Sequence, residues 1–92
     1  MRELYIGRRT AVSEDGSPYS FDYYILVDQM CVDGEFACES YGVKITALDC
    51  NESAALPNIT VNISRIDELM DLLLRSTVTP STLEDVVLDW IA

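Results

Sequence analysis

The side chains that could perform catalysis are few, and their spacing does not favour it. The 92-residue chain has no histidine, which removes the usual base for a serine or cysteine nucleophile and all histidine-bearing zinc sites. Lys44, the single lysine, alternates onto the polar side of an expected strand. An enzyme using carboxylates would need a pocket that holds two acids with raised pKa values, and the acids here are evenly spread. We therefore expect a non-enzymatic protein without a cofactor.

The cysteines are the remaining candidates for metal binding. Cys31, Cys38 and Cys50 are an odd number of thiols without a CxxC pair. Three thiolates and one carboxylate could bind zinc, but this spacing favours reduced, packed cysteines in an intracellular protein. We expect neither a disulfide nor a metal.

The charge is strongly negative and unevenly distributed. Sixteen acids and six basic residues give a net charge of -10. Arg2, Arg8 and Arg9 place half of the basic residues at the N-terminal end. The acidic remainder should repel nucleic acid and anionic lipid, so we expect no direct contact with either. One hypothesis is an acidic inhibitor that mimics nucleic acid and binds a basic protein surface; the simpler interpretation is that the charge provides solubility.

From the sequence we expect neither a secretory signal nor a membrane span. The N-terminal residues contain no apolar run of the required length, and the longest apolar runs are 23–27 and 72–74. We expect a cytoplasmic protein.

The first part of the chain alternates apolar and polar residues with the period of β-strands. Strands are expected at residues 3–12, 19–32 and 36–48. Turn formers separate them, with Asp15-Gly16 and Asp33-Gly34 at the corners. Gly42, inside the third strand, indicates a bulge or a close backbone approach.

A fourth strand and two helices are expected to complete the chain. After a loop over residues 49–57, Ile59, Val61 and Ile63 alternate with polar residues in a short strand. Ser64 is the expected cap of the first helix, and Thr79 followed by Pro80 is the expected start of the second. Apolar side chains recur on one side of each helix. These stripes are Ile66, Leu69, Met70, Leu73 and Leu74, and then Leu83, Val86, Val87, Trp90 and Ile91.

Two segments resemble a known family. The run ESYGVKI (39–45) and the longer run PNITVNISRIDELMDLLLRSTVTPSTLEDVVLDWI (57–91) follow a YYILV strand (23–27). Together they resemble a family of small uncharacterised acidic proteins from Gram-positive anaerobic bacteria, a domain of unknown function. The resemblance covers about three quarters of the chain and implies no activity for any residue.

The predicted fold is α+β: a four-stranded antiparallel sheet in meander order, with two C-terminal helices packed on one face. Residues 1–92 form a single domain, with 1–63 mainly β and 64–91 forming the two helices. The predicted function is a protein-interaction or regulatory module.

Four apolar residues fall outside the stripes that the fold should bury. Leu72 and Leu88 lie off the helix stripes, and Tyr24 and Leu26 should lie on the sheet face away from the helices. We expect these residues to contact a protein partner or a second copy of the chain, because exposed apolar patches mark interfaces.

Overall fold

The chain folds as four strands followed by two helices. The computed structural model describes residues 2–32 and 36–91, with the backbone alone for 30–32 and 36–38. The elements are β1 (Arg2–Val12), β2 (Pro18–Val32), β3 (Phe36–Ala47), β4 (Ser53–Thr60), α1 (Ile63–Arg75) and α2 (Leu83–Ile91).

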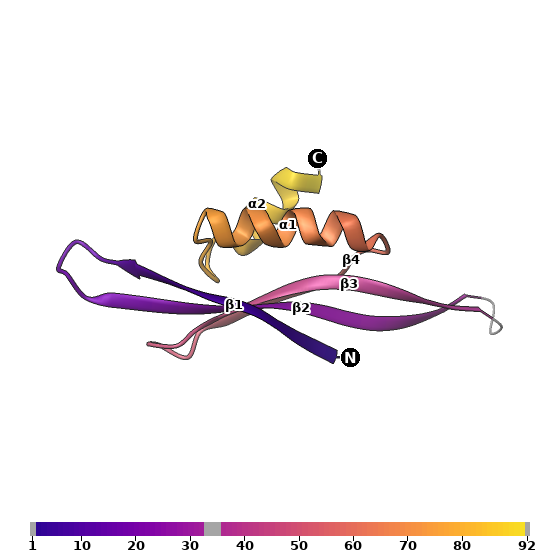
Figure 1. Ribbon diagram of the computed structural model, residues 1–92, viewed down its shortest axis with the longest axis horizontal. Helices are drawn as coiled ribbons and strands as arrows, with labels where there is room; N and C mark the ends of the chain where they lie inside the picture. The colour runs from indigo at the N-terminus through magenta and orange to yellow at the C-terminus, as the bar shows by residue number, and fades with distance from the viewer. Residues whose placement is uncertain (1, 33–35, 92) are drawn as a thin grey trace.

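The strands form one antiparallel sheet in the order β1-β2-β3-β4, and both helices lie on the same side of it (Figure 1). This arrangement confirms the predicted α+β meander. The first three strands lie within one residue of their predicted bounds. Long hairpins extend the sheet beyond the helices at both ends, so the molecule measures 55 × 25 × 17 Å. Gly16, at the first predicted corner, has a φ of 85°, whereas the Asp33-Gly34 turn lies outside the described residues.

One side of the sheet, the helix face, packs against the helices and forms the core. Alternate residues of β2 and β3 face α1, whose predicted stripe is buried except for the half-buried Leu74. The buried core residues are Phe21, Tyr23, Ile25, Val27, Val43, Ile45, Ala47, Ile66, Leu69, Met70, Leu73, Val78, Leu83 and Val87. Ile91 departs from its predicted stripe, because its side chain is 56% exposed at the end of α2.

A buried hydrogen bond joins the middle of the sheet to the link between the helices. The Tyr23 hydroxyl donates to the Val78 carbonyl at 2.7 Å, and the Tyr23 side chain is fully buried. The Val78 N–H donates to the Leu73 carbonyl at 3.1 Å, which closes the end of α1. The link is therefore hydrogen-bonded to the sheet through Tyr23 and to the end of α1 through Leu73.

The fourth strand was predicted in the wrong place. It covers Ser53–Thr60, so the predicted loop over 49–57 is largely strand, and Val61 and Ile63 are exposed after the strand ends. Only Ala54 and Leu56 are half-buried at the start of this strand. Two such residues, one of them small, make an alternating pattern too weak to predict a strand. Of the apolar residues further along, Ile59 lies in the strand, Val61 in the turn after it, and Ile63 at the start of α1.

Both helix starts also differ from the prediction. The cap of α1 is Asn62, not Ser64: its Oδ1 atom accepts the Ser64 N–H at 2.9 Å and the Arg65 N–H at 3.3 Å. Thr79 begins a turn rather than a helix, because the Thr82 N–H donates to its carbonyl at 3.2 Å. Helix α2 starts one turn later, at Leu83.

Gly42 marks a close backbone approach, as its type predicted. The pairing of β3 with β4 shifts between Tyr41 and Val43, where extra residues of β4 bulge. A Cβ atom on Gly42 would lie 2.3 Å from the Leu56 carbonyl oxygen and 2.6 Å from the Pro57 Cα. Since neither contact can relax by rotating a side chain, the bulge requires glycine at position 42.

We predict that Gly42→Ala lowers the free energy of unfolding by about 1–3 kcal/mol, because the new methyl group must displace the β4 backbone. Gly7→Ala is the matched control: its Cβ would lie 3.7 Å from Leu74 Cδ2, an ordinary contact. Urea denaturation measures both. Equal stabilities of the two variants would contradict the close approach.

We predict that Tyr23→Phe lowers the free energy of unfolding by about 1–3 kcal/mol at neutral pH, because the buried Val78 carbonyl loses its donor. Burial raises the pKa of Tyr23 from 10.0 to about 12. The native state therefore favours the neutral hydroxyl, and this stabilisation is present below pH 10 and lost as the pH rises toward 12. The difference between wild type and variant should shrink over that range. Tyr19→Phe, at a tyrosine that is 39% exposed, is the control and should leave the free energy of unfolding at neutral pH nearly unchanged.

Candidate interaction surface

The side of the sheet that faces away from the helices, here called the open face, is the candidate surface. Alternation places on it the residues between the core positions of each strand. They are Glu3, Tyr5, Arg8 and Thr10 of β1, Ser20, Asp22, Tyr24, Leu26 and Asp28 of β2, and Ser40, Gly42, Lys44 and Thr46 of β3. No helix covers this side among the residues that the structure describes (Figure 1).

Aromatic rings and an ion pair occupy the centre of the open face. Tyr5 and Tyr24 lie directly opposite each other on β1 and β2, and their rings meet edge to face with centroids 5.6 Å apart. Lys44 Nζ lies 5.7 Å from the Tyr24 ring centroid and 3.0 Å from a carboxylate oxygen of Glu3. Tyr24 is consequently half-buried by its neighbours instead of standing free.

A second charged group lies next to this cluster. Arg8 donates from Nε to Asp22 Oδ1 at 2.8 Å and from Nη2 to Oδ2 at 3.2 Å, and the Tyr5 hydroxyl donates to Oδ1 at 3.4 Å. Asp22 is only 6% exposed. The hydrogen bond from Arg8 lowers the pKa of Asp22 below its ordinary 3.8, although burial acts in the opposite direction. The Asp22 carboxylate is thus held in its ionised form by Arg8. An ionised, paired carboxylate supports the structure and has no proton to donate.

The four predicted contact residues do not form one surface. Tyr24 and Leu26 lie on the open face, while Leu72 and Leu88 lie on the helices, over the other side of the sheet. Leu26 is buried at 3% exposure, and its partner on β3 is Gly42, next to the Leu56–Pro57 backbone. Leu72 packs partly against the core, and Leu88 is 59% exposed. Partner binding by these residues stays a prediction.

The strand β1 carries an exposed apolar segment that the sequence analysis did not single out. Leu4, Tyr5 and Ile6, here called the edge strip, are 45%, 55% and 41% exposed. Ile6 is an extra residue in β1, because the pairing with β2 shifts between Tyr5 and Gly7. Three consecutive apolar residues near the start of the strand were the available signal.

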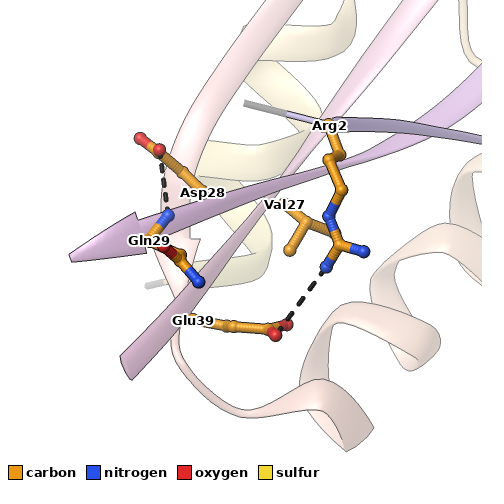
Figure 2. Close-up of a pocket in the computed structure, with 5 residues that line it drawn as sticks. All are labelled: Arg2, Val27, Asp28, Gln29 and Glu39. Carbon is orange, nitrogen blue, oxygen red and sulfur yellow. Dashed lines mark hydrogen bonds and ion pairs between the residues drawn. The ribbon is translucent and has the colours of Figure 1, made fainter. Parts of the chain in front are cut away.

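A hollow of about 590 Å³ lies at the same end of the sheet, beside Arg2. Figure 2 shows Arg2 and Glu39 pointing toward each other across Val27, with Asp28 and Gln29 on the adjoining stretch of β2. The ion pair between Arg2 and Glu39 is long, at 3.7 Å, and both side chains are substantially exposed.

Neither metal ligation nor a membrane span is found in the described part of the chain. Among the described side chains, those of residues 2–29 and 39–91, no three histidine, cysteine or acidic residues lie close enough to hold a metal ion. Cys50 is a free, exposed thiol, and the side chains of Cys31 and Cys38 lie outside the description. Over the same residues, neither helix has the length and apolar character needed to cross a membrane.

Comparison with known proteins gives one match. A family of unknown function, DUF6514, matches residues 2–92. The chain belongs to this family. Searches of curated proteins and of solved structures found no similar protein. Membership in DUF6514 therefore supports the resemblance to a domain of unknown function and adds no activity or site residue to the surface described above.

We predict that Asp22→Asn lowers the midpoint of urea denaturation at neutral pH, because Arg8 loses its charged acceptor. Since the native pKa of Asp22 is lowered, the ionised form stabilises the fold above pH 3.8, and this stabilisation is lost as the pH falls below that value. The gap between wild type and variant should therefore close in acid. Asp67→Asn, on the exposed side of α1, is the control, and a pH-independent gap would contradict this account.

Proposed function

We propose that this member of the family is a small non-enzymatic protein-interaction or regulatory module that works in the bacterial cytoplasm. Its partner is another protein or a second copy of the chain, and it contacts neither nucleic acid nor membrane directly. The observation that carries the proposal is the edge strip: an outer strand of the sheet exposes three consecutive apolar residues, Leu4 on the helix face, Tyr5 on the open face and Ile6 at the bulge. Exposed apolar side chains grouped on a small domain favour a protein contact.

The balance of charge on the open face supports the same function. Glu3 is paired with Lys44 and Asp22 with Arg8, so acids and cations alternate across the sheet. A mimic of nucleic acid would instead present carboxylates in an unbroken row, close to the phosphate spacing of about 1.7 Å per charge along the duplex axis. We therefore rank the acidic inhibitor below the interaction module.

Affinity capture after cross-linking in the source cell tests the proposal. We expect a protein that, once purified, also binds the purified chain directly in a calorimetric titration. Double-stranded DNA added as a competitor should leave that complex intact, whereas it would displace an acidic mimic from a basic partner. Sedimentation over a range of salt concentrations tests for a second copy, whose association should strengthen as salt screens the charge of -10. A monomer at every salt concentration without any direct binder would contradict the proposal.

A further inference from the structure

The outer side of α2 combines exposed apolar side chains with carboxylates. Leu88 and Ile91 are 59% and 56% exposed and lie one helical turn apart. Glu84 and Asp85 lie one turn before Leu88, Asp89 follows it, and all three acids are exposed. These five residues are here called the α2 surface. Figure 1 shows that the end of α2 lies beyond α1, on the side away from the sheet.

The packing of α2 does not require this combination of residues. Leu83 and Val87, which are buried, make its core contacts. The helix dipole favours Glu84 and Asp85 in the first turn, but it disfavours the negative charge of Asp89, which lies in the last turn. Solubility would account for the carboxylates, but not for two exposed apolar side chains among them. A contact with another molecule accounts for both.

No cation among the described residues pairs with the carboxylates of the α2 surface. The sequence of α2, LEDVVLDWI, contains three acids and no basic residue. On α1, by contrast, both arginines are paired with acids of their own helix. The three carboxylates of α2 can therefore pair with cations that a partner supplies.

These charges distinguish between the possible partners. Nucleic acid and anionic lipid are negatively charged and would be repelled. A second copy that met the chain through the same surface would set three carboxylates against three. A metal ion is not an alternative, because no three acids among the described side chains lie close enough to hold one. A protein segment with lysine or arginine beside apolar residues complements both features of the surface.

The shape of α2 indicates the conformation of that segment. The backbone groups along a helix are already hydrogen-bonded within it, so side chains must make the contact. A second helix alongside α2 would place apolar residues three or four positions apart opposite Leu88 and Ile91. The nine residues of α2 extend over about 14 Å, which about three turns of a partner helix would cover.

We propose that the α2 surface binds a basic amphipathic helix of a partner protein. Its apolar pair packs against apolar residues of that helix, and its three carboxylates pair with lysine or arginine. This inference rests on the proposed interaction function, assigns it a surface other than the edge strip, and specifies the partner by chemistry. Charge-assisted pairing around a small apolar contact supplies specificity as well as affinity.

Selection from a random peptide library displayed on phage tests the inference, with the full chain as bait. Peptides of about twelve residues can form three helical turns. Peptides that also bind the Leu88→Gln variant are removed, so that those which need the α2 surface remain. We expect the remaining sequences to combine lysine or arginine with apolar residues three or four positions apart. Circular dichroism checks that the variant folds.

The best synthetic peptide is then titrated into the purified chain. Trp90, the single tryptophan, lies half-buried between Asp89 and Ile91, with Arg65 4.3 Å from the centre of its ring, so its fluorescence should change on binding. The peptide should become helical as it binds. Its affinity should fall as salt is added, because salt screens the attraction between opposite charges.

Two further variants separate the apolar contact from the charge. Ile91→Gln should weaken the peptide about tenfold, because it removes an apolar contact. Asp89→Asn should weaken it about two- to fivefold, as expected for an exposed ion pair. Asp67→Asn makes the same change of net charge on α1, and Leu4→Gln exchanges an exposed apolar residue of β1 for glutamine. Both controls should leave binding nearly unchanged.

The inference is overturned if no peptide survives the removal step, or if the surviving peptides lack basic residues or bind without becoming helical. It is also overturned if Asp67→Asn weakens binding as much as Asp89→Asn, because net charge alone would then explain the contact. A protein captured from the cell that binds wild type and Leu88→Gln equally would uphold the proposed interaction function through a different surface.

Discussion

The hydrogen bond between the Tyr23 hydroxyl and the Val78 carbonyl is the constraint on which the arrangement of layers depends. A tyrosine at the centre of a four-stranded sheet brings a polar group into the core, and a buried hydroxyl is costly unless it has a partner. The partner comes from the link between the helices, residues 76–82, so this hydrogen bond holds the link against β2. Leu83 and Val87 then lie against the same core as the strands. Placement of α2 follows from satisfying one hydroxyl as well as from burying apolar surface.

Electrostatics ties the first strand to the rest of an acidic molecule. Each arginine of β1 contacts a different element: Arg2 contacts Glu39 of β3, Arg8 contacts Asp22 of β2, and Arg9 contacts the last turn of α1. The three arginines that make the N-terminal segment basic therefore hold β1 to the rest of the fold. Individual exposed pairs contribute little, but Asp22 is buried and accepts from both Arg8 and Tyr5. The open face is ordered by these contacts in the absence of a covering layer.

Much of the fold could be predicted from periodicity, and the failures have physical causes. β2 and β3 alternate apolar and polar side chains, and β1 is rich in strand-forming residues before a clear turn, which locates all three strands within a residue. In β4 the half-buried Ala54 and Leu56 give only a weak alternation of apolar and polar residues. The bulge at Pro57 then interrupts that alternation. The cap of α1 was misplaced because Asn62 and Ser64 are both good caps and local sequence cannot rank them. Leu26 was expected on the surface, but it is buried opposite Gly42, and the alternation of its own strand does not encode what lies across the sheet.

The irregular fourth strand has a consequence for assembly. A sheet with two regular outer strands can add neighbours on both sides and grow into fibres. Here Pro57 has no N–H to donate, and the pairing of β4 with β3 is bulged beside Gly42, so this outer strand lacks a regular row of backbone donors and acceptors. Edge-to-edge stacking of sheets is therefore disfavoured on the β4 side.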